Sequence, residues 1–250
     1  MSKVRNLIFG HGISARHSRG AVKNQVFTLL RIWRNYHHHD FGIERFIRLS
    51  LALLQFLTPG LYIKQLLHGR SNTTKKLAIE IYVIFKMIFP ILVMKSGNAG
   101  NIYTVWIVSF FLFETIIYIT SLIFIADAAR ESVQPRRSLV LLLVNFFEIV
   151  LDFALFYAFC EQHYEHFFTR PLHGTTDAIY FSFVTAATVG FGDIAPLHVL
   201  AEKLTIIQLT LTFVFVGLFL NYFASLLQSH SQVSVAGRLG KLRHTQKKKS

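Results

Sequence analysis

Four long apolar stretches constrain this chain more than any other feature. They occupy residues 77–94, 102–126, 139–160 and 203–228. Each has the roughly 18 or more mostly apolar residues that a helix needs to cross a bilayer. Because the bilayer core offers no water to hydrogen-bond a free backbone, such segments must be helical. The sequence therefore predicts an all-α membrane protein with four spans.

The composition agrees with a membrane protein and disfavours other classes. Of the 250 residues, 52% are hydrophobic, and the mean hydropathy is +0.44. Soluble domains are less apolar than this. The formal net charge is +13, and the basic residues concentrate before residue 50 and after residue 235. We expect both ends to face the cytoplasm and to contact anionic lipid. Nucleic-acid binding, the other function that a basic chain suggests, is disfavoured by the spans.

The first part of the chain precedes these spans and is basic. Residues 1–20 are polar and contain glycine, and we expect them to be disordered. Residues 21–36 space their apolar side chains as an amphipathic helix does, which suits the headgroup region. In the tract His37–His39, consecutive residues point to different sides of a helix. The tract therefore predicts a solvated segment rather than a metal site, with a pH-sensitive element as the alternative.

Residues 46–67 are apolar but short for a span, because Pro59 and Gly60 interrupt them. Basic residues flank both sides of this segment. A crossing here would place one basic cluster outside the cell, against the positive-inside tendency. We predict an interfacial or re-entrant helix pair on the cytoplasmic side, with a fifth span as the alternative.

The connectors between spans orient the chain. The connector 127–138 carries three arginines and should lie inside, whereas 161–173 is acidic and histidine-rich and should lie outside. Both termini are then cytoplasmic, and any loop between the last two spans enters from outside.

Between the last two spans lies the run Thr188-Val189-Gly190-Phe191-Gly192, followed by Asp193. A helical stretch of roughly 12 residues, too short to cross a bilayer, precedes it. If successive residues take mirror-related conformations, their carbonyls all point the same way, and glycine adopts the left-handed half cheaply. Strands of this kind around an axis would present rings of carbonyl oxygens, which replace the water shell of a bare cation.

This run, with the short helix before it and an apolar helix on each side, resembles the selectivity filter of the potassium channel family, the pore-loop cation channels. The resemblance covers about residues 138–230 and implies a pore domain of outer helix, pore helix, filter and inner helix. The alternative is an unrelated re-entrant turn. The resemblance further implies that K⁺ binds only at this filter, without a cofactor or covalent chemistry, so no enzyme is expected. The ion sites would be the Thr188 side chain and the backbone carbonyls of Thr188, Val189, Gly190 and Phe191, with Gly192 permitting the conformation.

The surroundings of the filter depart from the common family pattern. Phe191 lacks the hydroxyl of the usual tyrosine. Val184 stands where some family members keep a glutamate that bonds the residue corresponding to Asp193, so we expect Asp193 to bond Tyr180 instead. The filter would then be held less firmly, which favours filter-based inactivation. At the start of the pore helix, Thr175 or Thr176 is expected to act as the cap, with Asp177 in the first turn.

The last span would be the inner helix. By alignment with the family, Thr212 takes the place of a common hinge glycine and Gly217 that of a second small residue. Phe215, Phe219 and Phe223 recur at i, i+4 and i+8, close to one stripe. Rings of phenylalanine at this stripe could close a pore by dewetting. A packing or lipid-facing stripe is the alternative.

Charged residues within the spans suggest a buried network. Glu148 and Asp152, with Asn145, share one face of the third span, and Lys86 and Glu114 lie near the midpoints of the first two. Their similar depth predicts a Lys86–Glu114 pair, with Glu148 as the competing partner. The pair either fixes helix packing or contributes to gating. No span carries arginine at every third position, so we expect no strong voltage sensor.

One filter copy cannot enclose an ion, so the resemblance implies a homotetramer. We predict a potassium-selective channel subunit that conducts passively across the cell membrane. A weakly selective cation channel and a non-conducting modulatory subunit are the alternatives. The expected regions are a basic cytoplasmic and interfacial region 1–76, two peripheral spans in 77–137, a pore domain 138–230 and a basic tail 231–250.

Overall fold

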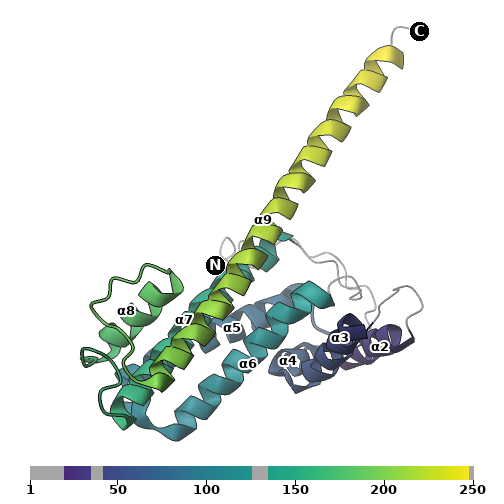
Figure 1. Ribbon diagram of the computed structural model, residues 1–250. Coiled ribbons are helices and arrows are strands. Elements are labelled where there is room, and N and C mark those ends of the chain that lie inside the picture. Colours follow the sequence, from purple (N-terminus) through teal and green to yellow (C-terminus); the bar gives the residue numbers. More distant parts are fainter. Residues whose placement is uncertain (1–19, 35–41, 126–134, 248–250) are drawn as a thin grey trace, which may run out of the picture.

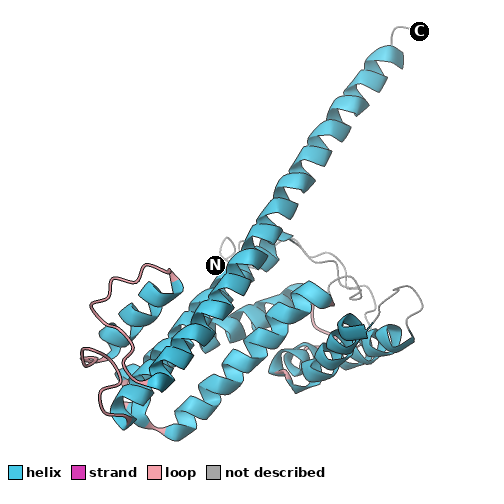
Figure 2. Cartoon of the chain, in the orientation of Figure 1, coloured by secondary structure: helices cyan, strands magenta, loops and turns pink. Residues whose placement is uncertain are grey.

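The computed structural model describes residues 20–34, 42–125 and 135–247, and every regular element in them is a helix. The predicted disordered segment, apart from Gly20, lies outside the described residues, as do the His37–His39 tract and most of the connector 127–138. The remaining elements form a helical bundle with one helix extending far beyond it (Figures 1 and 2).

The four predicted spans are confirmed as helices long and apolar enough to cross a membrane. They are α5 (Asn72–Lys95), α6 (Ile102–Phe124), α7 (Pro135–His163) and α9 (Val199–Lys247). Side-chain caps begin two of them. The hydroxyl of Ser71 accepts a hydrogen bond from the Thr74 amide at 3.1 Å, and the Asn101 side chain accepts one from the Tyr103 amide at 2.9 Å.

α7 lies at the centre of the bundle. It packs against α5, α6 and α9 and is the most buried of the four spans. Its buried face includes Val150, Phe153, Ala154 and Tyr157, which join the main hydrophobic core. A short 3₁₀ turn, η2 (Asn98–Gly100), connects α5 to α6. The peripheral helices and the last helix are thus held together through α7.

The N-terminal helices form a small group beside α6 (Figure 1). They are α2 (Ala21–Arg34), α3 (Gly42–Leu54), the 3₁₀ turn η1 (Gln55–Leu57) and α4 (Pro59–Leu66). Ile32, Leu51 and Ala52 bury themselves against Ile125 at the end of α6. The chain bends by 60° between η1 and α4, at the predicted Pro59 break. The structure therefore contains the expected helix pair, which counts as a fifth span only if the bent pair is taken as one segment.

α9 is longer than the predicted span 203–228. It runs for 49 residues and leaves the bundle as a single rod (Figure 1). No proline follows Pro196 in the sequence, so no residue type in the basic tail forces the helix to end. The predicted tail 231–250 is therefore helical as far as Lys247.

Candidate functional site: a pore loop between two spans

The site begins with α8 (Thr175–Ala186), a 12-residue helix between α7 and α9, as the sequence predicted. The predicted cap is wrong, because the N-cap residue is Gly174, at φ 92°, and no side chain caps the helix there. Asp177 interacts with the preceding loop instead. Its carboxylate accepts a hydrogen bond from the His173 amide at 2.9 Å and lies 3.6 Å from the Arg170 guanidinium. A carboxylate in the first turn also suits the positive end of the helix dipole.

The loop after α8 has an alternating backbone. Thr188, Gly190 and Gly192 have φ values of 54°, 61° and 80°, whereas Val189 and Phe191 between them do not take positive φ. Every second residue is thus left-handed, which is the alternation expected for a row of carbonyls pointing one way. The sequence predicted this conformation at Gly190 and Gly192 but not at Thr188. The two-residue spacing of the glycines, continued back from Gly190, leads to Thr188.

Backbone hydrogen bonds attach this loop directly to the end of α8. The Thr188 amide donates to the Thr185 carbonyl at 2.9 Å, and the Val189 amide donates to the Val184 carbonyl at 3.0 Å. The side chain of Val184 cannot bond Asp193, but its carbonyl holds the start of the loop. The position of the loop therefore follows the position of the last turn of α8.

Tyr180 supports the outer end of the loop. Its hydroxyl donates a hydrogen bond to Asp193 Oδ1 at 3.2 Å, the contact that the sequence analysis expected. Its ring lies parallel to that of Phe191, with centroids 6.5 Å apart and an interplanar angle of 2°. Partial desolvation, followed by the hydrogen bond to Asp193, raises the pKa of Tyr180 above its ordinary value. The phenol therefore keeps its proton and remains a donor.

The chain's own helices leave this loop uncovered. Residues 187–193 are all exposed, and the side chains of Val189 and Phe191 are 51% and 68% exposed. Among the described residues, no group of three or more His, Cys, Asp and Glu side chains could hold a metal ion.

The inner helix presents two different faces. Its buried face runs along α7 and α8 and contains Ala201, Gln208, Thr212, Phe215 and Leu218. Phe213, Val216, Gly217 and Leu220 are exposed on the other side.

The phenylalanine stripe predicted on α9 is divided between these faces. Phe215 is only 3% exposed, and its ring lies 5.2 Å from that of Phe146 on α7. Phe219 is partly buried against the same core, and Phe223 is 49% exposed. The buried face repeats with steps of three and four residues, whereas the predicted stripe used steps of four only. The structure thus favours the packing alternative for Phe215.

A buried polar cluster that the sequence analysis missed joins three helices at the pore loop. The Tyr157 hydroxyl on α7 donates to Gln208 Oε1 on α9 at 2.7 Å. Gln208 Nε2 donates to the Ser182 carbonyl at 2.9 Å and to its hydroxyl at 2.8 Å, and that hydroxyl donates to the Val150 carbonyl at 2.5 Å. We call these residues the Gln208 network. A lone glutamine inside an apolar span was the signal that could have revealed it.

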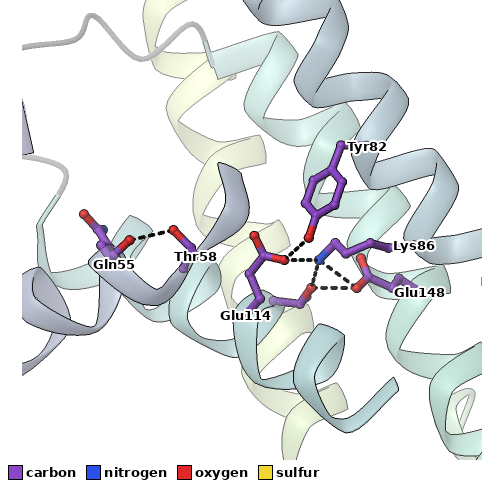
Figure 3. Close-up of polar contacts among 7 residues, drawn as sticks. Gln55, Thr58, Tyr82, Lys86, Glu114 and Glu148 are labelled. Atoms are coloured by element: carbon purple, nitrogen blue, oxygen red, sulfur yellow. Dashed lines mark hydrogen bonds and ion pairs between the residues drawn. The ribbon is translucent and has the colours of Figure 1, made fainter. Parts of the chain in front are cut away.

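The predicted intramembrane charges also come together, between α5, α6 and α7 (Figure 3). Lys86 Nζ lies 2.9 Å from Glu148 Oε1 and 3.5 Å from Glu114 Oε2, so it pairs with both candidate partners. Thr115 accepts from Lys86 at 2.8 Å and donates to Glu148 at 2.8 Å. The hydroxyl of Tyr82 donates to Glu114 at 2.6 Å. We call these residues the Lys86 cluster.

Two further polar side chains on α7 are buried on the predicted face with Glu148. Asn145 is 3% exposed and Asp152 is fully buried. Neither carboxylate oxygen of Asp152 has a hydrogen-bond partner within the described residues. The shared face is therefore as predicted, but Asp152 has no hydrogen bond to the Lys86 cluster.

Residues 140–229, which contain α8, the loop and most of both flanking spans, match the family model described as an ion channel. "Two-pore potassium channel 4" of Arabidopsis thaliana is 36% identical over 83 residues. This match covers 31% of the present chain and 29% of the relative, so the chain spans less than a third of that protein's length. No solved structure matches the chain.

Together, the helices, the loop and the family match define a membrane protein with an ion channel domain. More closely, residues 140–229 are similar to an ion channel family model, and the chain includes a stretch similar to part of a two-pore potassium channel, in line with the resemblance noted in the sequence.

Proposed function

We propose that this chain is the subunit of a potassium-selective channel that conducts K⁺ passively by backbone-carbonyl coordination. The observation that carries the proposal is the alternation of left-handed φ at Thr188, Gly190 and Gly192, directly after a 12-residue helix that cannot span a bilayer. Such a backbone orients successive carbonyls to one side, where they can replace the hydration shell of a cation. K⁺ is the permeant ion, and the proposal requires no cofactor.

The proposed channel is a homotetramer. One loop supplies only one side of each ion site, so a closed ring of copies is required. The exposed loop and the exposed face of α9, with Phe213 65% and Leu220 59% exposed, support this assembly because the subunit leaves them without a covering partner among its described residues. The C-terminal end of α8 carries the negative end of the helix dipole toward the inner end of the filter, where it would stabilise a cation.

The proposed orientation places both termini in the cytoplasm of a cell membrane, with α8 entering from outside. The basic ends of the chain would contact anionic lipid on the inner surface. The two peripheral spans contain no periodic arginines, so the proposed channel is not strongly voltage-sensing.

A flux assay tests the proposal. The purified protein in liposomes should carry K⁺ down its gradient and discriminate against Na⁺ in reversal potentials. Equal permeability would support a weakly selective cation channel, and no flux would support a non-conducting modulatory subunit. Gly190→Ala is the matched control, because alanine is strained at a φ of 61° and should abolish selective flux.

A further inference from the structure

The Gln208 network leaves little freedom to the helices that it joins. Gln208, Ser182 and Tyr157 are each fully buried. Both donor hydrogens of the Gln208 amide are used on Ser182, and its oxygen accepts from Tyr157. A buried polar atom that loses its partner costs roughly 1–3 kcal/mol. The network is therefore satisfied in one relative placement of α7, α8 and α9 and disfavours others.

The tyrosine of the network is itself held in place by aromatic packing. The ring of Tyr157 makes edge contacts with Phe181 on α8 at 4.8 Å and with Phe168 at 5.7 Å between centroids. Phe168 also contacts Phe181, at 4.7 Å. Because α7 presents this hydroxyl in a fixed position, Gln208 cannot follow a movement of α9 without giving up its bond to Tyr157.

The other end of the network lies close to the filter along the backbone. Ser182 is one turn before Thr185, whose carbonyl accepts the Thr188 amide at 2.9 Å. The carbonyl of Ser182, four residues before the end of α8 at Ala186, accepts a hydrogen bond from Gln208 Nε2 at 2.9 Å. Gln208 on the inner helix is therefore connected to the first left-handed residue of the filter through two hydrogen bonds and one helical turn.

The geometry points to Gln208 as a positioning residue that ties the inner helix to the last turn of the pore helix and so keeps the filter conductive. This inference rests on the proposed function. It goes beyond that function by naming the side chain through which a displacement of α9 would reach the filter. Gln208 is fully buried, whereas the loop 187–193 is exposed, so we assign it no direct contact with a permeating ion. Its effect is exerted through Ser182 and the carbonyls of α8.

The decisive variant is Gln208→Leu, which keeps a similar volume and removes every polar contact of the network to α9. In liposomes, its K⁺ current at low external K⁺ should decay roughly fivefold faster than that of the wild type, the factor for one net hydrogen bond of ordinary strength. Its reversal potential in mixed K⁺ and Na⁺ should shift toward that of a less selective pore. Thr120→Val is the control, because the Thr120 hydroxyl bonds only the Ile116 carbonyl of its own helix, α6.

A double variant tests whether the residues act as one unit. Tyr157→Phe removes one oxygen and should also speed the decay. Tyr157→Phe combined with Gln208→Leu should decay no faster than Gln208→Leu alone, because their shared bond can be lost only once. Fully additive effects of the two substitutions on the decay rate would contradict a coupled network. They would indicate two independent packing changes.

The outcomes separate this inference from the proposed function. A wild-type protein that passes no ion would overturn both. A wild type that conducts selectively, with decay and reversal potential unchanged in Gln208→Leu, would overturn the positioning role alone. If Gln208→Leu does not assemble, the decay and reversal potential of Tyr157→Phe test the positioning role instead. This variant preserves the ring of residue 157 and its packing.

Discussion

Tyr180 supports the loop that we propose as the filter. Its hydroxyl bonds Asp193 at 3.2 Å, on a chain where Val184 offers no carboxylate to that aspartate. The same ring lies parallel to Phe191, which has no hydroxyl of its own. At the scale of the residue, the outer end of the proposed filter is therefore held by the phenol of Tyr180 through Asp193.

We expect Tyr180→Phe to accelerate current decay. The substitution keeps the ring against Phe191 and removes the hydrogen bond to Asp193, a loss of about 1 kcal/mol that corresponds to a roughly fivefold faster decay. The measurement is the time course of K⁺ current in liposomes at low external K⁺. Tyr103→Phe on α6 is the control, because that side chain is 74% exposed and far along the chain from the loop. Equal decay in Tyr180→Phe and wild type would contradict a supporting role.

At the scale of the element, α9 has one buried face and one exposed face. The face with Gln208, Thr212 and Phe215 is buried against the subunit, whereas Phe213 and Leu220 are exposed. In the proposed channel, α9 would pack with one face and border the pore with the other, and this division fits that arrangement because each residue faces one side only. The phenylalanines alone did not reveal the division, since phenylalanine occurs on both faces.

Phe215→Ala should therefore lower stability rather than open a gate. Removing a side chain that is 3% exposed and packed on Phe146 leaves a cavity, which costs on the order of 3 kcal/mol. Unfolding of the detergent-solubilised protein measures the loss. The matched control is Ile123→Ala on α6, because Ile123 is 46% exposed. Wild-type stability together with raised basal current would instead assign Phe215 to the gate.

At the scale of the whole molecule, the Lys86 cluster connects α5 and α6 to α7. Lys86 belongs to α5, Glu114 to α6 and Glu148 to α7, and all three are buried. Such a pair adds little net stability compared with apolar packing, but breaking one side of it leaves a buried charge without compensation. The cluster therefore specifies how the helices dock.

Lys86→Met should be strongly destabilising, by roughly 3–5 kcal/mol, because Glu148 and Glu114 lose their cation. Adding Glu148→Gln should recover part of the loss by removing one of the stranded charges. The comparison uses unfolding midpoints in detergent, with Lys95→Met at the exposed end of α5 as the control. If the double variant is no more stable than Lys86→Met, the pair does not fasten these helices.

Local signals made most of this architecture predictable. The apolar stretches, the Pro59 break and the spacing of Thr188–Asp193 each depend on neighbouring residues, and the corresponding elements are present. The hydrogen bonds of Gln208 could not be predicted from the sequence, because its partners come from α7 and α8. Helix packing decides which face of α9 is turned toward those two helices. The start of α8 was mispredicted for a similar reason. Asp177 accepts a hydrogen bond from the His173 amide, and this bond depends on how the loop before α8 folds.

The left-handed residues of the proposed filter differ in the conformational cost of their backbone. Gly190 and Gly192 take positive φ freely, but a β-branched residue does so at a cost of roughly 1–2 kcal/mol. In the proposed orientation, the inner end of the filter therefore stores conformational free energy, and the rotation of one peptide plane would release it. In a ring of four copies, each copy would store this conformational free energy at the same depth along the conduction path. If the filter unwinds, it should begin to do so from the side of the cytoplasm.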